Sequence, residues 1–410
     1  MATTRKHATR LALCAALLFA FTAASLHAAG CVKWESASSG LDLGKGSGVL
    51  EVAVGGEQPV AYAIVDGVGL FASQDLGKTW TAVQGDAPCL KTPFTVAAAP
   101  KDGKSVFVSV ATAGGGLWRS ADGGKTWEKC GGKDKGMASD DAEGITFCAK
   151  DPNLMLVGHR AGKAISVSPD GGKTWAARDI GAEMKAQIVF ALSDTKWVVA
   201  SRAGEGIRVT EDSGATWSAG TGSADYFAGP LPVVQTDEYL FSSKHHGTNK
   251  SVDGGKTWQY AMERHARVIG TAGPNVFRED RADIRGEPAR IITLNLSEDY
   301  GNSWVDVTGA LTQLVPANLQ EHIVIQNKVD PFAHVRFATA WAVAPSGQTV
   351  FLGLGKAGLY RGQLMWTPKG PRVPEAGVEP PAVAEGDSKT KLKVRAVASG
   401  REAKVRKVCA

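Results

Sequence analysis

The chain has few cysteines, and none of them stands in a metal-binding or haem-binding pattern. Its 410 residues include six cysteines, with no Cys-x-x-Cys pair, no Cys-x-x-Cys-His haem attachment site and no Cys/His set at zinc spacing. The sequence therefore gives no support for a metal or haem centre, and we expect no cofactor.

Long apolar runs are also scarce. The one candidate, residues 11–24, follows three cations within the first ten residues and precedes Ala28-Ala29-Gly30. This order is typical of a secretory signal peptide, and the run is too short to span a bilayer comfortably. We therefore expect residues 1–30 to be a signal peptide and the protein to be exported, either periplasmic or secreted. Cys31 leaves lipoprotein processing open, although Ala28 stands where Leu is usual.

The C-terminal residues 367–410 contain no aromatic side chain. Five prolines precede a Lys/Arg-rich stretch, and the segment has ten Lys/Arg against five Asp/Glu. It cannot bury enough apolar surface to fold alone, so we expect a disordered tail. The whole chain has a net charge of +5, so the residues between the two basic ends are close to −3. We therefore expect the tail to make at most a weak contact with anionic surfaces, and the body to bind no nucleic acid.

One eight-residue phrase, in six copies, dominates the rest of the chain. Each copy reads Ser/Thr-x-Asp-x-Gly-x-Thr/Ser-Trp, and successive copies are 41 to 48 residues apart. The copies are Ser73–Trp80, Ser120–Trp127, Ser168–Trp175, Thr210–Trp217, Ser251–Trp258 and Ser297–Trp304. A period of this length is typical of one four-stranded β-propeller blade.

Each position of the phrase suits a tight turn between two antiparallel strands. We expect the aspartate to accept backbone N–H bonds, the glycine to adopt a positive φ and the hydroxyls to complete the bonding. The tryptophan should begin the next strand and pack between neighbouring sheets, where its indole N–H needs an acceptor. The residues predicted to be structural in this way are Asp75, Asp122, Asp170, Asp212, Asp253, Asp299, Trp80, Trp127, Trp175, Trp217, Trp258 and Trp304.

The phrase resembles the Asp-box, also called the bacterial neuraminidase repeat, over roughly residues 34–366. The resemblance implies a β-propeller similar to those of sialidases, xyloglucan-cleaving hydrolases, sortilin-type receptors and photosystem II assembly propellers. In those families the box lies at the blade periphery, away from the central pocket. We therefore expect the aspartates of the phrase to be structural rather than catalytic.

The repeat predicts an all-β fold, a single seven-bladed propeller over residues 31–366. A seventh unit follows the last copy, with its phrase decayed to residues 362–366, and Trp34-Glu35-Ser36 reads like the residues after a phrase tryptophan. We expect the strand around Trp34 to complete the last blade and close the ring, which leaves no sheet edge open. Six or eight blades would require discarding one of these segments.

Export permits disulfides between the cysteines that remain after the signal peptide. Cys89 and Cys130 follow predicted outer strands and could meet on adjacent blades, and Cys130 with Cys148 is equally open. The spacing does not choose between these pairings. Cys31 and Cys409 lie near the two ends of the mature chain.

Function is expected on the axial face, where the loops from strand two to strand three and from blade to blade meet. In the predicted third to seventh blades these loops form an Arg/His-rich sector that could bind a carboxylate, sulfate or phosphate. Alternatively, they are solvated residues that pair with nearby carboxylates such as Glu205 and Glu279. The candidate ligand-binding residues are His159, Arg160, Lys163, Arg202, Asp225, Tyr226, His245, His246, Glu263, Arg264, His265, Arg278, Arg281 and Arg336.

Two classes of function fit this face. The first is a non-catalytic exported monomer that binds a protein partner or an acidic glycan, as in the photosystem II assembly propellers. The second is a glycan-active enzyme, either a sialidase-like hydrolase with two facing carboxylates or a uronate lyase with a His or Tyr base. Sialidases carry a Phe/Tyr-Arg-Ile-Pro phrase in the first blade, whereas residues 48–54 here contain no Arg, which argues against sialidase activity.

Overall fold

The structure, a computed structural model, describes residues 32–365 except 45, 47, 111–114, 202–204, 223–232, 237–238, 245–246, 263–265, 273–274, 281–292 and 315–339. The predicted signal peptide and C-terminal tail lie outside these residues, so both stay predictions. None of the helices in the described ranges is long and apolar enough to cross a membrane.

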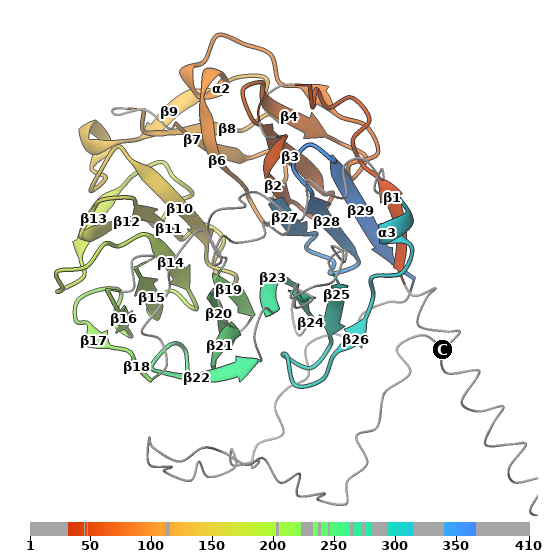
Figure 1. Cartoon of the computed structure of the whole chain (residues 1–410). Coiled ribbons are helices and arrows are strands. Elements are labelled where there is room, and N and C mark those ends of the chain that lie inside the picture. The colour runs from red at the N-terminus through yellow and green to blue at the C-terminus, as the bar shows by residue number, and fades with distance from the viewer. Residues whose placement is uncertain are drawn as a thin grey trace, which may run out of the picture.

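The described residues form an all-β β-propeller whose strands make seven sheets arranged around a common centre (Figure 1). The strands nearest the centre are β2 (Val49–Gly55), β6 (Pro93–Ala98), β10 (Ala142–Phe147), β14 (Ile188–Ala191), β19 (Val233–Thr236), β23 (Ala266–Ala272) and β27 (Ala340–Val343). The second strands are β3 (Val60–Val65), β7 (Val106–Val110), β11 (Met155–His159), β15 (Trp197–Ala200), β20 (Tyr239–Lys244), β24 (Asn275–Asp280) and β28 (Thr349–Gly353). Each pairs antiparallel with the first strand of its sheet.

The outer half of each sheet contains the repeated phrase or its counterpart. The third strands are β4 (Gly69–Ser73), β8 (Leu117–Ser120), β12 (Ala164–Ser168), β16 (Ile207–Thr210), β21 (Gly247–Ser251), β25 (Thr293–Ser297) and β29 (Leu359–Leu364). The fourth strands are β5 (Thr81–Ala82), β9 (Glu128–Gly131), β13 (Ala176–Asp179), β17 (Ser218–Ala219), β22 (Thr257–Met262), β26 (Val305–Asp306) and β1 (Val32–Ser36). The short elements are α2 (Pro88–Lys91), α3 (Leu311–Leu314), the 3-10 turn Lys133–Lys135 and β18 (Thr221–Gly222), which pairs parallel with β22.

The N-terminal strand β1 joins the sheet that the C-terminal strands form. It pairs antiparallel with β29, with Val32 opposite Leu364 and Ser36 opposite Tyr360. The predicted strand around Trp34 is therefore present. Trp34 is buried, and its indole N–H donates to the carbonyl of Val307, beyond the outermost strand of the preceding sheet, at 3.2 Å.

The six repeat turns share one hydrogen-bond arrangement. In the turn of residues 120–127, the Asp122 carboxylate accepts the backbone N–H of Thr126 at 2.9 Å and its hydroxyl at 2.7 Å. The Ser120 hydroxyl donates to Asp122 at 2.8 Å and accepts the N–H of Gly124 at 2.8 Å. The other five turns repeat these four bonds within 2.6 to 2.9 Å. In each turn the aspartate thus accepts a backbone N–H and a hydroxyl from within the same turn.

Two consecutive residues of each turn, not one, have a left-handed backbone. The glycine of the phrase has φ between +80° and +94°, as predicted. The residue before it also has a positive φ, and here Leu76, Ser213 and Tyr300 accept φ of +55° to +57°. The glycine position stays glycine because an added Cβ would also meet the neighbouring structure, as at Gly172, where Phe107 Cε1 lies 2.7 Å away.

The sheets pack face to face, and five of the second strands are buried on both sides. Every residue of β3, β7, β11, β15 and β28 is buried, which explains their continuous apolar sequences. The tryptophans of the phrase enter these contacts: Trp80 meets Phe351 of β28 edge to face, with ring centroids 6.5 Å apart. Apolar packing thus joins the sheet of β2 to β5 to the sheet that contains β27 to β29.

The cysteine pairings that the sequence left open are not formed. Cys89, Cys130 and Cys148 are free and buried. Burial raises the pKa of the Cys89 thiol and of the Cys130 thiol to about 12. These side chains therefore act as small apolar groups of the core rather than as crosslinks.

Candidate functional site

The candidate site lies at the edge of the sheets opposite the repeat turns. In the sheet of β10 to β13, Ala142 at the start of β10 pairs with His159 at the end of β11. The repeat turn Ser168–Trp175 begins at the other end, where Ser168 pairs with Met155. The connection into β10 and the loop after β11 therefore meet at one edge, which we call the axial face.

Four of the predicted ligand-binding residues are described, namely His159, Arg160, Lys163 and Arg278. The others lie outside the described residues, and their placement stays a prediction: Arg202, Asp225, Tyr226, His245, His246, Glu263, Arg264, His265, Arg281 and Arg336.

His159 is a buried structural side chain, which corrects its prediction as a ligand-facing group. It is 0% exposed, and its Nε2 lies 2.7 Å from Ser166 Oγ. Its Nδ1 lies 3.3 Å from the carbonyl oxygen of Asp141. Because that carbonyl can only accept, Nδ1 carries the proton and Nε2 accepts from the serine. Burial lowers the pKa of His159 to about 4, so the ring is neutral at ordinary pH.

The serine that contacts His159 also holds a loop. Ser166 Oγ accepts the backbone N–H of Ala138 at 2.9 Å. The imidazole, the hydroxyl and residues 138–141 thus form one partly buried network between β11, β12 and the connection into β10. This network fixes Asp141 at the axial face.

Arg160 remains at the surface and is held from two sides. Its guanidinium carbon lies 4.5 Å from the centroid of the Phe94 ring, and its Nη2 lies 3.5 Å from Asp141 Oδ1. The side chain of Arg160 is nevertheless 43% exposed. A stacked guanidinium that keeps free N–H groups can still bind a carboxylate or another anion.

Phe94 reaches Arg160 through a β-bulge. Pairing in the innermost strand β6 shifts between Pro93 and Thr95, so Phe94 is an extra residue. The same irregularity occurs in two other innermost strands, where Leu50 of β2 and Glu143 of β10 are the extra residues. Bulges of this kind turn side chains out of the regular alternation and often occur beside binding sites. Sequence reasoning missed them, because nothing in one strand shows how it pairs with the next.

The carboxylates of this edge already have partners. Glu51 accepts the hydroxyl of Thr95 at 2.8 Å and the N–H of Val96 at 3.0 Å, which links β2 to β6. Glu143 accepts from the Gln187 amide at 3.4 Å, and that amide also donates to the Arg160 carbonyl at 3.1 Å. These bonds connect neighbouring innermost strands.

Lys163 and Arg278 are each engaged with a neighbouring side chain. Lys163 forms an exposed ion pair with Glu183. Arg278, predicted in a loop facing the axis, lies within β24, and its guanidinium carbon is 4.3 Å from the ring centroid of Trp304. Arg278 therefore packs on a tryptophan of the repeated phrase, and its assignment as an axial ligand is corrected.

Within the described ranges, no group of three or more His, Cys, Asp or Glu side chains is placed to hold a metal ion. Glu205, which the sequence offered as a pairing partner, accepts the N–H of Lys185 at 2.6 Å and the hydroxyl of Ser201 at 3.0 Å. The described part of the axial face thus combines one held, exposed arginine with partnered carboxylates.

Comparison with solved structures shows the fold. The chain is similar to a GH74 xyloglucanase from Xanthomonas campestris, with 16% identity, a TM-score of 0.51 and coverage of 80% of this chain and 53% of that one. It is also similar to YCF48 bound to a D1 peptide, with 15% identity, a TM-score of 0.53 and coverage of 82% and 97%. A third is the extracellular domain of a hybrid two-component system protein from B. thetaiotaomicron, with 9% identity, a TM-score of 0.52 and coverage of 78% and 40%.

This chain spans about half the length of the solved xyloglucanase and less than half of the solved extracellular domain. No family model matches the sequence, and no curated protein matches it either. The structural neighbours have different functions at low identity, so the likeness shows a β-propeller and nothing finer.

Proposed function

We propose that this chain is an exported, non-catalytic β-propeller that binds a protein or an acidic glycan through its axial face. The observation that carries the proposal is the arrangement of Arg160, Phe94 and Asp141. The aromatic ring and the carboxylate hold the guanidinium in place, yet the Arg160 side chain stays 43% exposed. An arginine held in this way loses little conformational freedom when it pairs with a carboxylate or sulfate of the ligand.

The bonded state of the carboxylates favours binding over glycan chemistry. A hydrolase needs one carboxyl group to protonate the leaving oxygen and a second to act as nucleophile or base. Glu51 and Glu143 are engaged between innermost strands, and Asp141 faces Arg160. A lyase would need an accessible base, and His159 is buried and neutral. A glycan-active enzyme on the same face remains the alternative, and it would depend on the candidates outside the described residues.

One structural neighbour supports a binding role. YCF48, whose structure contains a D1 peptide, is covered over 97% of its length, so the likeness extends over nearly the whole of that protein. We infer that a propeller of this size can serve as a peptide-binding module without additional domains. The proposal takes from this neighbour only the class of activity.

The proposal includes the finer architecture expected from the sequence. We propose that each of the seven sheets is one blade and that β1 closes the ring by pairing with β29. The bond from the Trp34 indole to Val307 supports this reading, because it continues the sheet-to-sheet contacts across the point where the two ends of the propeller meet. We also propose that the N-terminal segment directs export. Sequencing the N-terminus of the purified protein tests whether this segment has been removed.

The binding proposal is tested with Arg160→Ala, Arg160→Lys and the control Arg178→Ala. Arg178 is an exposed arginine of β13 whose Nη1 donates to the carbonyl of neighbouring Ala177. Arg178→Ala therefore removes the same charge as Arg160→Ala, but at a position away from the axial face. Ligands are sought with a glycan array and by capture of proteins from an extract of the source cells, and each hit is titrated by calorimetry. We expect Arg160→Ala to weaken binding by about 10- to 100-fold, Arg160→Lys to weaken it less, and Arg178→Ala to leave it unchanged.

Two results would contradict the proposal. One is a ligand whose affinity is the same for the parent and for Arg160→Ala. The other is turnover of a sialoside, uronate polymer or xyloglucan by the purified protein, which would establish the enzymatic alternative instead.

A further inference from the structure

Two tryptophans of the phrase, Trp80 and Trp175, and the related Trp34 link neighbouring sheets through their indole N–H groups. At three junctions between sheets the indole donates to a carbonyl of the preceding sheet's outer segment. These bonds run from Trp34 to Val307 at 3.2 Å, from Trp80 to Ala37 at 2.7 Å and from Trp175 to Cys130 at 3.0 Å. Each acceptor lies three residues after the tryptophan of its own sheet, namely Trp304, Trp34 and Trp127 respectively. The bond closes the outer end of the junction.

The junction between the sheet of β2 to β5 and the sheet of β6 to β9 lacks this link. Trp127 donates its indole N–H to Gly124 of its own turn, at 3.0 Å. The acceptor position for this junction would be Val83, three residues after Trp80. Trp127 is only half-buried, whereas Trp80 is 4% exposed. This junction is therefore more open at its outer end.

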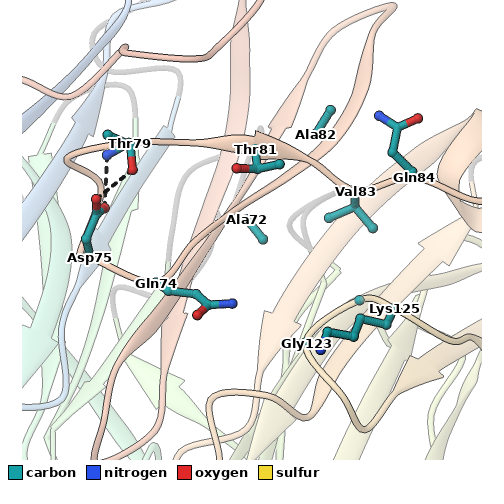
Figure 2. Close-up of a pocket in the computed structure, with 11 residues that line it drawn as sticks. Ala72, Gln74, Asp75, Thr79, Thr81, Ala82, Val83, Gln84, Gly123 and Lys125 are labelled. Atoms are coloured by element: carbon teal, nitrogen blue, oxygen red, sulfur yellow. Dashed lines mark hydrogen bonds between the residues drawn. The ribbon is translucent and has the colours of Figure 1, made fainter.

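A pocket of about 500 Å³ lies at this opening, and it is lined by Val83, Gly123 and Gly124 among others. Figure 2 shows residues of the 72–84 segment on one side and Gly123 and Lys125 from the next repeat turn on the other. Trp258 makes the same bond within its own turn, but there β18 pairs with β22 and the indole is 3% exposed, so that junction is covered.

The pocket offers neutral hydrogen-bonding groups around a small apolar surface. Gln74, Gln84 and Thr81 supply two amides and a hydroxyl, and Lys125 supplies one ammonium group. Both oxygens of Asp75 are used inside its turn, where they bind the N–H and the hydroxyl of Thr79 at 2.9 and 2.6 Å (Figure 2). Amides and hydroxyls both donate and accept, as the hydroxyl groups of a sugar require. A single cation gives little preference for a strongly charged anion.

We propose that this junction pocket is a second binding site, for one or two units of a neutral saccharide. Its volume lies within the range of about 300 to 1,000 Å³ that small-ligand sites occupy. It lies beside the repeat turns, at the edge opposite Arg160, so it is separate from the proposed axial function. The apolar surface of Ala72, Ala82 and Val83 suits the C–H face of a sugar ring.

The repeat supplies a matched pair of variants that fill or spare the pocket. Gly123→Tyr places a large side chain in it, and Tyr300 shows that the same turn position accepts tyrosine, with φ of +57°. Gly171→Tyr makes the identical change in the next repeat turn, away from the pocket. Lys125→Ala and Lys173→Ala form a second pair at one turn position, and neither change alters the backbone.

The probes are cellobiose, maltose and N,N′-diacetylchitobiose, tested by saturation-transfer NMR and calorimetry. We expect at least one to bind the parent, with a Kd at least about tenfold higher in Gly123→Tyr and unchanged in Gly171→Tyr. Lys125→Ala should weaken binding and Lys173→Ala should not, which decides the matter if Gly123→Tyr fails to fold. Arg160→Ala should leave disaccharide binding intact, so a failure of the axial proposal is distinguishable.

The proposal is overturned if none of the three disaccharides binds the parent. It is also overturned if a bound disaccharide has equal affinity for the parent, Gly123→Tyr and Lys125→Ala, because the binding would then lie elsewhere.

Discussion

At the scale of single residues, burial decides which of two adjacent polar side chains can act on a ligand. His159 and Arg160 are neighbours at the end of β11, and their side chains have opposite surroundings. His159 is fully buried against Ser166, while Arg160 stacks on Phe94 at the surface. The sequence presents both as candidates, because a residue at the last position of a strand faces inward or outward according to the pairing of that strand.

The buried imidazole predicts a loss of stability in mild acid. The pKa of His159 falls from 6.5 to about 4 on folding, so the unfolded chain binds an additional proton between these values. The folded state keeps its full stability from this group above pH 6.5. As the pH falls toward 4, the free energy of unfolding decreases by up to about 3 kcal/mol, because only the unfolded chain takes up the proton. The free energy of unfolding, measured by denaturant titration from pH 7.5 to 4, should fall more steeply for the parent than for His159→Gln.

The turn aspartates serve as an internal reference for that measurement. Hydrogen bonds from Thr126 and Ser120 lower the pKa of Asp122 to about 2, so its contribution is lost only as the pH falls from about 4 to 2. The two windows do not overlap. Equal pH profiles for the parent and His159→Gln between pH 4 and 6.5 would contradict the assignment of a neutral, buried His159.

Adjacent glycines of one turn should respond differently to the same change. Gly172→Ala combines a φ of +83° with a Cβ only 2.7 Å from Phe107 Cε1, whereas Gly171→Ala has a φ of +73° and meets nothing closer than 4.0 Å. We expect Gly172→Ala to lower the free energy of unfolding by about 2 to 3 kcal/mol and Gly171→Ala by about 1 kcal/mol. Thermal or urea unfolding of both variants checks the order, and equal losses would mean that strain, not contact, sets the cost.

At the scale of elements, the positions of strands could be predicted from the sequence, because they follow local patterns. Features that depend on how a strand pairs with its neighbour could not. The sequence predicts strands at 94–98, 105–110 and 117–120, and the structure has β6, β7 and β8 at Pro93–Ala98, Val106–Val110 and Leu117–Ser120. Alternation and the turn phrase are local signals, so these elements were confirmed.

The errors share one physical cause. The bulge at Phe94, the inward direction of His159 and the contact of Arg278 with Trp304 all depend on how two strands pair or how two side chains pack. Neither can be read from spacing along one strand. Of the described candidate site, the sequence therefore offered Arg160 as a candidate but missed Phe94 and Glu143, which shape its surroundings.

At the scale of the whole molecule, one sheet differs from the rest in the origin of its fourth strand, the strand that pairs with its third. In the other sheets that strand follows the third strand along the chain, whereas β29 pairs with β1 from the opposite end of the described residues. Val32 and Trp34 are buried in the same apolar cluster as Leu296 and Leu352. If the pairing of β1 with β29 closes the ring, as proposed, then the ring depends on the presence of both strands.

Removing β1 should therefore destabilise the entire propeller. A chain that lacks residues 1–37, compared with one that lacks residues 1–31, loses the partner of β29, the Trp34 ring and the bond to Val307. We expect its free energy of unfolding to fall by more than about 4 kcal/mol, and we expect concentration-dependent association, because the open β29 edge can pair with another chain. Thermal unfolding and light scattering after size-exclusion chromatography measure the two effects. Deleting residues 367–410 is the control. This deletion should leave the melting temperature unchanged, and the protein should remain monomeric. A monomer with parental stability after loss of β1 would show that this strand does not close the ring.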